Sequence, residues 1–217
     1  MNQNKLGTFI TLEGLDGVGK TTHIEFIKNY IEDHGFKTFL TREPGGTEVG
    51  EKLREILLFY NETIHKNTEL FLMFASRQEL ISNVIIPKLN ENYFVISDRF
   101  LDSSYAYQGG GRKIDINHIE FLTSMLNDFY KPDLTLLFNA SINNIFQRIS
   151  GSTQKDRIEK ENLEFFQRVQ DVYFHLQQQD PARIHLISTD CSKEITQEHI
   201  KHLLDNLLNH KLNLINQ

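Results

Sequence analysis

The 217-residue sequence contains one cysteine, four prolines and no tryptophan, and it has no long run of apolar residues. The single cysteine, Cys191, cannot form a disulfide within the chain, which predicts a reducing environment. No apolar run approaches the length of a membrane-spanning helix, and the first residues, MNQNKLGTF, lack the apolar segment of a secretory signal. We therefore expect a cytoplasmic protein that does not interact with membranes.

Positive charge is also in short supply, because 23 lysines and arginines are outnumbered by 29 acidic residues, which gives a net charge of −6. Nucleic-acid-binding domains typically carry a basic surface, so we expect no nucleic-acid partner. The sequence contains no internal repeat and no linker rich in serine, glycine or proline. We therefore expect a single domain over residues 1–217, in which any bound anion is held by locally placed cations.

Short apolar runs alternate with longer helical patterns along the chain. Five runs of strand character cover residues 8–12, 37–41, 93–97, 134–138 and 184–188. Apolar residues recur at helical spacing over 116–129 and 163–176, and Pro132 and Pro181 follow these two patterns. The alternation predicts an α/β fold, a doubly wound, five-stranded parallel sheet flanked by helices, with ligands at the carboxyl ends of the strands.

The stretch GLDGVGKT at residues 14–21 matches the phosphate-binding pattern G-x-x-x-x-G-K-[ST] in full and lies between a predicted strand and a predicted helix. Its glycines let backbone N–H groups point into one concavity, and the following helix adds its positive N-terminal end. We expect Lys20 to reach the phosphate oxygens of a nucleoside triphosphate and Thr21 to bind Mg²⁺. The predicted ATP-binding residues of this loop are Gly14, Leu15, Asp16, Gly17, Val18, Gly19, Lys20, Thr21 and Thr22. The alternative, a glycine-rich turn with a chance lysine, is disfavoured by the flanking strand and helix.

Two further motifs follow predicted strands. In TREPGG, Pro44 ends the strand and leaves Arg42 and Glu43 at the carboxyl edge of the sheet, where the arginine either binds a phosphate or lies in solvent. In YFVISDRF, Asp98 ends the strand and is the expected second Mg²⁺ residue, while Arg99 adds a cation at the same edge. A surface Asp–Arg pair is the alternative interpretation.

The stretch DSSYAYQGGGR places Ser104, Tyr107 and Gln108 within about one helical turn of each other. Hydroxyls, an amide and an aromatic ring together suit recognition of a base and a sugar. The alternative is a plain short helix that is capped by Asp102 or Ser103 and ended by Gly109.

In LFLMFASRQ, either Met73 or Phe74 precedes Arg77 by about one helical turn. An aromatic face followed by a forked donor could stack on a base and donate a hydrogen bond to its carbonyl. Taken alone, this apolar stripe is more typical of ordinary core packing.

In this order, GLDGVGKTT, TREPGGT, DRF, SSYAYQGGGR and DRIE at 156–159 resemble the motifs of bacterial thymidylate kinase. The resemblance covers about residues 8–173. It implies a P-loop nucleoside-monophosphate-kinase fold with a mobile lid at about 148–160, usually in a homodimer. It also implies transfer of the γ-phosphoryl group of ATP to dTMP with Mg²⁺, giving dTDP and ADP for dTTP synthesis.

The resemblance further implies a set of dTMP-binding residues. These are Asp16, Arg42, Phe74, Arg77, Arg99, Ser104, Tyr107 and Gln108. Asp16 would approach the sugar 3′-hydroxyl, Arg42 and Arg99 would hold the phosphate, and Arg77 would contact a thymine carbonyl. Tyr107 would crowd the position of a ribose 2′-hydroxyl. In the family an aromatic ring usually precedes the base-reading arginine by four residues; in this chain Met73 holds that position and Phe74 follows it.

The predicted lid offers Arg148, Lys155 and Arg157 as candidate cations for the triphosphate, and it has a small-residue stretch at 151–153 that suits a moving flap. We expect Arg148 to bind ATP. The expected catalytic residues are Lys20, Arg99 and Arg157, which would surround the transferring phosphoryl group.

Two other functions stay open at this point. A deoxynucleoside kinase would attack through a neutral hydroxyl and need a carboxylate as general base, for which Glu43 is the candidate. A dTMP phosphate, by contrast, loses its second proton at about pH 6 and is already a nucleophile at neutral pH. A nucleotide-dependent switch is the other possibility, but the N-K-x-D sequence typical of guanine-reading switches is absent.

Overall fold

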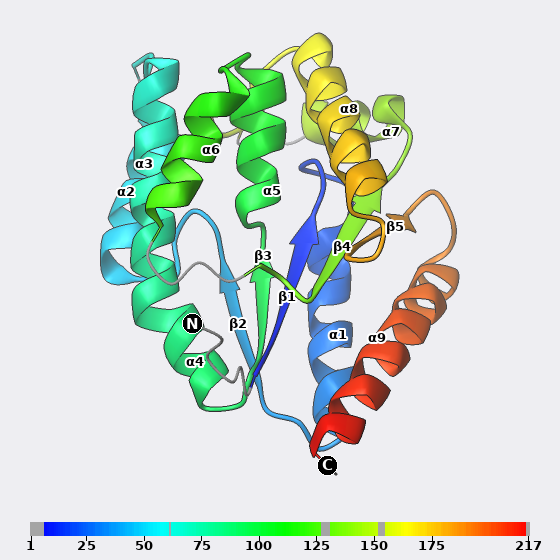
Figure 1. Ribbon diagram of the computed structural model, residues 1–217. Helices are drawn as coiled ribbons and strands as arrows, with labels where there is room; N and C mark the ends of the chain where they lie inside the picture. Colours follow the sequence, from blue (N-terminus) through cyan, green and yellow to red (C-terminus); the bar gives the residue numbers. More distant parts are fainter. Residues whose placement is uncertain (1–6, 61, 127–130, 152–154, 216–217) are drawn as a thin grey trace.

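The structure is a computed structural model that describes residues 7–60, 62–126, 131–151 and 155–215 (Figure 1). Five parallel strands form one sheet in the order β2-β3-β1-β4-β5. The strands are β1 (Thr8–Glu13), β2 (Thr38–Arg42), β3 (Phe94–Asp98), β4 (Leu134–Asn139) and β5 (Ile184–Ser188). Each boundary lies within one residue of the range expected from the sequence, and the doubly wound α/β fold is confirmed.

The register of the sheet brings the sequence motifs to one edge. Strand β1 is central and fully buried, and it pairs with β3 on one side and β4 on the other. Asp98 at the end of β3 is level with Leu12 of β1 and with Arg42 of β2. Because the strands are parallel, the loops that follow β1, β2 and β3 all leave from the same end of the sheet.

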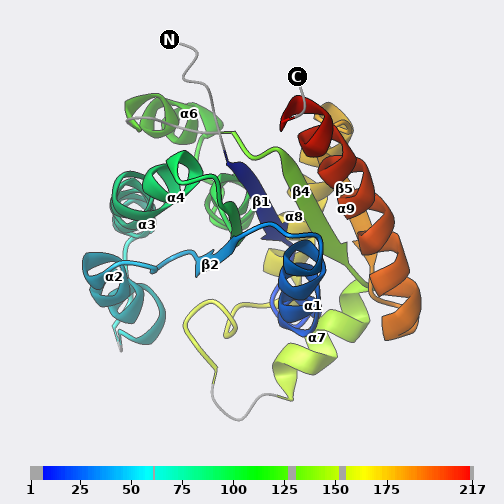
Figure 2. The same cartoon turned by 90° about the horizontal axis from the view of Figure 1, so that it is seen from below.

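Helices cover both faces of the sheet. They are α1 (Lys20–Asp33), α2 (Glu48–Phe59), α3 (Lys66–Leu80), α4 (Ile86–Asn90), α5 (Leu101–Ser104), α6 (Ile116–Met125), α7 (Ile142–Ser150), α8 (Leu163–Gln179) and α9 (Lys193–Ile215), with π-helical segments η1 (Ile81–Ile85) and η2 (Tyr105–Gly111). Figure 2 shows α1 and α9 on one side of the sheet and α3, α4 and α6 on the other. None of the helices in the described ranges is long and apolar enough to cross a membrane.

The alternation of side chains along the strands divides the core into two clusters. Ile10 and Leu12 of β1 face α1 and α9, whereas Phe9, the residue before Ile10, lies on the opposite face and packs in the cluster of α3 and α6. The second face also carries buried polar groups, since Thr11 and Thr135 share a hydrogen bond of 2.7 Å. Polar side chains on this face lead toward the carboxyl end of β1.

The helical pattern at 116–129 was expected to run on to Phe129, but α6 ends at Met125. Phe129 belongs to residues 127–130, which lie outside the described part of the chain. The pattern at 163–176 is confirmed as α8, which ends at Gln179 before Pro181.

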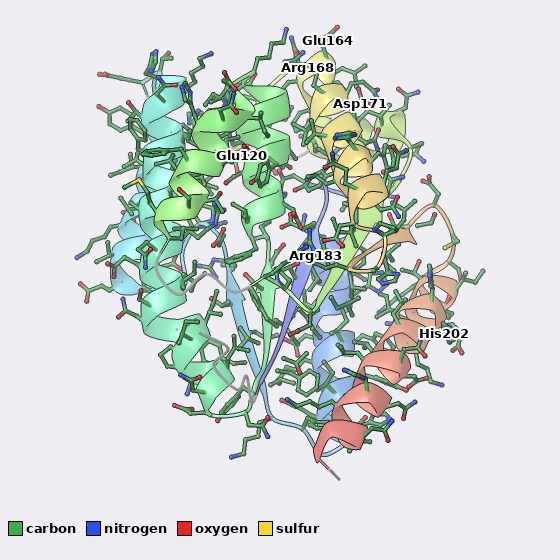
Figure 3. The ribbon with its side chains drawn as sticks, viewed as in Figure 1. Glu120, Glu164, Arg168, Asp171, Arg183 and His202 are labelled. Carbon is green, nitrogen blue, oxygen red and sulfur yellow. The ribbon has the colours of Figure 1, made fainter. Side chains whose placement is uncertain are left out.

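The helix that begins in DSSYAYQGGGR does not end at Gly109 but continues to Gly111. Neither Asp102 nor Ser103 caps α5, because the helix begins at Leu101 and continues through Gly109 as η2. The physical reason is close packing of α8 on η2: a Cβ at Gly111 would lie 2.5 Å from the Phe165 ring. Arg168 of α8, labelled in Figure 3, also donates to the carbonyl oxygens of Gly110 and Gly111 at 3.3 and 3.0 Å.

Candidate active site

A cavity of about 390 Å³ lies at the carboxyl ends of β1, β2 and β3. Most of the predicted site residues line it. They are Asp16, Gly17, Gly19, Lys20, Thr21, Thr22, Arg42, Asp98, Arg99, Tyr107, Gln108 and Arg157. The predicted residues that do not line it are Gly14, Leu15, Val18, Phe74, Arg77, Ser104 and Arg148. The structure therefore joins the glycine-rich loop, both arginine motifs and the tyrosine–glutamine pair in one wall.

The glycine-rich loop folds around its own lysine. Gly14, Gly17 and Gly19 have φ angles of 129°, 72° and 105°, which a residue with a side chain rarely adopts. The Lys20 ammonium donates to the carbonyl oxygens of Gly14 and Leu15, both at 3.1 Å. Burial, reinforced by the neighbouring Arg99, lowers the pKa of Lys20 to about 8 although three carboxylates oppose the shift. An anion placed beside the ammonium would favour its charged form.

Arg99 connects the end of β3 to the glycine-rich loop. It has a φ of 72°, and its guanidinium donates to Asp16 Oδ1 at 2.6 Å and to the Gly14 carbonyl oxygen at 2.8 Å. The Tyr107 hydroxyl accepts from Arg99 at 3.1 Å and donates to Asp16 Oδ2 at 3.0 Å. Burial opposes ionisation of Asp16, but Arg99 and Lys20 outweigh it and lower its pKa to about 2. Asp16 is therefore an ionised acceptor for hydroxyl groups at neutral pH.

Glu13, the last residue of β1, supports this arrangement from behind. It is fully buried and accepts hydrogen bonds from the Phe100 backbone N–H at 2.8 Å, the Ser103 hydroxyl at 2.6 Å and the Tyr173 hydroxyl at 2.9 Å. The same two hydroxyls lie 3.3 and 3.4 Å from Arg99 Nη1. Burial and the nearby charge of Asp102 raise the pKa of Glu13 to about 7.

Arg183 pairs with Asp102 on the far side of this cluster. Its guanidinium donates to both carboxylate oxygens, at 2.6 and 3.2 Å, and to the Thr135 hydroxyl at 2.8 Å. Figure 3 labels Arg183 just before β5, in front of the sheet. The Asp102 carboxylate, whose charge raises the pKa of Glu13, is thus held in an ion pair with Arg183.

The predicted base-side residues of α3 lie one layer behind the cavity wall. Arg77 is fully buried and donates to both oxygens of Glu43, with its shortest contact at 2.6 Å, and to Ser104 Oγ at 2.9 Å. Phe74 is in the second core cluster, with its ring 4.9 Å from the Arg77 guanidinium carbon. At this point the wall of the cavity is formed by Met73. The roles of Phe74, Arg77 and Ser104 stay predictions.

The two lid arginines lie in different places. Arg157 pairs with Glu69 of α3 at 2.6 Å and donates to the Leu57 carbonyl oxygen at 2.9 Å. Arg148 is exposed on α7 and donates to the Gly17 carbonyl oxygen at 3.2 Å. Residues 152–154 of the predicted lid lie outside the described part of the chain.

The sequence motifs did not reveal several residues of the site. Arg54 of α2 lines the cavity and donates to the Pro44 carbonyl oxygen at 2.8 Å, which adds a cation beside Arg42. Glu69 also lines the cavity, although it lies among the apolar residues of α3. Glu13 and Tyr173 are in a strand and a helix whose patterns indicate core. Only the carboxyl-terminal position of Glu13 on β1 could have drawn attention to it.

Thr21 and Asp98 are the residues that could hold a divalent cation. Both line the cavity, and Asp98 Oδ1 is enclosed without a hydrogen-bond partner in the described ranges. Carboxylate and hydroxyl oxygens suit Mg²⁺. Because these ranges contain no group of three or more His, Cys, Asp or Glu that could hold a metal, such an ion would take its other ligands from phosphates and water.

Comparison with known proteins gives a consistent result. A family model described as thymidylate kinase matches residues 12–200. A thymidylate kinase of Nitrosospira multiformis is 46% identical over 188 residues, which cover 87% of this chain and 92% of the relative. That of Ruthia magnifica is 45% identical over 199 residues, with coverage of 91% and 97%. A crystal structure of thymidylate kinase from Ehrlichia chaffeensis matches with a TM-score of 0.75 and 32% identity, over 92% of this chain and 98% of that one.

The raised pKa of Glu13 predicts a pH-dependent stability. Glu13 contributes to the free energy of unfolding below about pH 4.5, and this contribution is lost as the pH rises to about 7. The reason is that the unfolded chain releases the Glu13 proton at a lower pH than the folded protein does. The free energy of unfolding of the wild type minus that of Glu13→Gln should therefore fall over this range, by on the order of 2 kcal/mol. Urea unfolding at several pH values measures it, with Glu120→Gln on the surface of α6 as the control. A difference that is flat between pH 4.5 and 7 would contradict the raised pKa.

Proposed function

This chain belongs to the thymidylate kinase family, and we propose that its cavity binds ATP along the glycine-rich loop and dTMP along the edge formed by Arg42, Arg54 and Arg99. The reaction of the family is ATP-dependent phosphorylation of dTMP to dTDP, and this chain is such a kinase. The observation that carries the placement is the single cavity shared by Lys20 and these three arginines.

On the donor side, consecutive backbone N–H groups of the loop and the Lys20 ammonium would bind the β- and γ-phosphates of ATP. Arg148 would bind the same nucleotide, which its contact with the Gly17 carbonyl supports. Thr21 and Asp98 would hold Mg²⁺, which would neutralise phosphate charge. The magnesium dependence is part of our proposal.

On the acceptor side, Arg42 and Arg99 would hold the dTMP phosphate, and Arg54 would assist them. Asp16 would accept a hydrogen bond from the sugar 3′-hydroxyl, since its oxygens are ionised and lie at the cavity wall. Tyr107 would close the sugar side to a ribose 2′-hydroxyl.

The chemistry needs positioning and charge stabilisation more than proton transfer. The phosphate of dTMP is already a nucleophile at neutral pH, so no general base is required. Lys20, Arg99 and Arg157 would surround the γ-phosphoryl group as it moves. A deoxynucleoside kinase would need Glu43 as base, but both Glu43 oxygens accept hydrogen bonds from the buried Arg77. This pairing favours a monophosphate acceptor.

We also propose a cytoplasmic homodimer of single-domain subunits. One sheet with helices on both faces supports the single domain, and nucleotide substrates support the location. The inner faces of α3 and α6 pack in the same core cluster. The outer faces of these two helices carry exposed apolar side chains, which support the dimer. Phe71, Phe121 and Met125 are 58%, 64% and 61% exposed, which predicts that a second copy covers this face.

A panel of acceptors tests the proposed function directly. With ATP and Mg²⁺, dTMP should be phosphorylated at least about 10²-fold more efficiently than thymidine, because the cavity offers cations for the acceptor phosphate and the candidate base Glu43 is paired with Arg77. A coupled assay for ADP, with dTDP identified chromatographically, measures both rates. Faster use of thymidine would support the nucleoside kinase, and ADP release without dTDP would support a nucleotide switch.

The two lid arginines are expected to differ. Arg157→Ala should lower kcat by on the order of 10³-fold, because a cation beside the transferring phosphoryl acts mainly in the transition state. Arg148→Ala should raise the KM for ATP with a smaller effect on kcat. Arg157→Lys keeps a charge for Glu69 and controls for loss of that pair. If Arg157→Ala leaves kcat within a few-fold of the wild type, Arg157 does not reach the reacting group.

Phe121→Asp tests the proposed dimer face. A charge at the centre of an apolar interface should convert the protein into a monomer, because it would be buried without a partner. Sedimentation velocity should give twice the chain mass of 25.4 kDa for the wild type and the single mass for the variant. Glu120→Gln, on the adjacent position of α6, is the control. A wild type that sediments as a monomer would exclude the dimer.

A further inference from the structure

Gln108 presents an unused hydrogen-bond acceptor at the cavity. The residue lies on η2, lines the cavity and is 2% exposed. Its amide nitrogen donates to Glu69 Oε1 at 2.8 Å, whereas its amide oxygen is enclosed and has no hydrogen-bond partner among residues 7–60, 62–126, 131–151 and 155–215. A buried carbonyl oxygen without a partner is unfavourable, so a ligand that donates a hydrogen bond at this point would gain affinity.

Glu69 determines which end of the Gln108 amide is left free. It is 1% exposed and is held by two arginines, Arg112 through Nε at 3.1 Å and Arg157 through Nη1 at 2.6 Å. Burial alone would raise the pKa of Glu69, but Arg112 and Arg157 outweigh it and lower the pKa. An ionised carboxylate only accepts hydrogen bonds. The amide of Gln108 must therefore turn its NH₂ group toward Glu69 and keep its carbonyl oxygen on the other side.

The backbone around Gln108 is fixed as well. The Ile114 backbone N–H donates to the backbone carbonyl oxygen of Gln108 at 3.0 Å, and the Arg112 backbone N–H donates to the backbone carbonyl oxygen of Tyr107 at 2.8 Å. Arg168 of α8 donates to the backbone carbonyl oxygens of Gly110 and Gly111, the last two residues of η2. Neither a shift of the backbone nor a flip of the amide is available without loss of these bonds.

Pyrimidine bases differ in the hydrogen-bonding group that they offer at ring position 3. Thymine and uracil carry an N–H donor there, whereas cytosine carries a bare nitrogen that only accepts. A protein oxygen held in place pairs with the first kind and repels the second, while a free amide could rotate to suit either. The placement of the base on this side of the cavity rests on the proposed function above.

We propose that Glu69 is a positioning residue that locks the Gln108 amide with its carbonyl oxygen toward the acceptor base, and so restricts the enzyme to pyrimidine nucleotides with an N–H at position 3. Glu69 does not touch the substrate in this arrangement. It prevents the Gln108 amide from turning its NH₂ group toward the base, which is the orientation that a cytosine nucleotide would need.

Glu69→Gln tests the proposal, because a neutral amide at this position can either accept from or donate to Gln108. The measured quantity is kcat/KM for dTMP divided by kcat/KM for dCMP. We expect the ratio to fall by roughly tenfold or more, through weaker use of dTMP and stronger use of dCMP. A merely structural role would lower both activities together and leave the ratio as in the wild type, which would overturn the proposal.

Glu161→Gln is the matched control. Glu161 pairs with Arg112 on the side away from Glu69, so this variant removes one negative charge from the same cluster without touching Gln108. Its dTMP-to-dCMP ratio should stay within about twofold of the wild type. An equal fall in both variants would mean that cluster charge, and not the amide orientation, sets the preference, and would overturn the proposal.

A second measurement uses a dTMP analogue in which C–H replaces N–H at ring position 3. The wild type should bind it at least roughly tenfold more weakly than dTMP by calorimetry, and Glu69→Gln should show a smaller penalty. If Glu69→Gln does not fold, as judged by circular dichroism, Gln108→Met takes its place and should show no penalty. A wild type that binds both compounds equally overturns the proposal. A wild type that does not phosphorylate dTMP at all instead overturns the proposed function.

Discussion

The contact of Arg99 with Asp16 and with the Gly14 carbonyl oxygen is the interaction on which the rest of the site depends. It joins the end of β3 to the glycine-rich loop that follows β1, two segments about 80 residues apart in sequence and adjacent in the sheet. A guanidinium at this junction is shared by the two halves of the cavity. In the proposed arrangement it would contact an acceptor phosphate on one side and a γ-phosphate on the other, as in-line transfer between two nucleotides requires.

Buried carboxylates at and behind the cavity wall hold polar and basic side chains in place. Glu13 orients two hydroxyls that face Arg99, Glu43 holds Arg77, and Glu69 holds Gln108. The charges of Glu43 and Glu69 are compensated by buried or half-buried arginines. Buried carboxylates are tolerated in a low-dielectric interior when they are paired in this way. The chain therefore carries a net negative charge and still presents cations to its ligands. Its acidic residues near the site serve largely to position basic and polar side chains.

The sequence predicted the fold, and it also identified the glycine-rich loop that lines the cavity, because both depend on local patterns. Strand periodicity and the spacing of Gly14, Gly19 and Lys20 are visible without knowledge of packing. The base side was less predictable. On a helix, one residue turns a side chain by about 100°, so the choice between Met73 at the wall and Phe74 in the core depends on how α3 packs. Arg54, Glu69 and Tyr173 reach the site from helices whose patterns show only surface or core, and the π-helical course of η2 follows from the contact with α8.

Simultaneous binding of the two nucleotides is the most direct test of one cavity with two anion-binding halves. Isothermal titration of the protein, first saturated with a non-hydrolysable ATP analogue and Mg²⁺, should show one equivalent of dTMP bound per chain. Prior saturation with dTMP should in turn leave one site for the analogue. If either nucleotide displaces the other, or if dTMP at millimolar concentration produces no binding heat and no displacement, the two-site account is wrong.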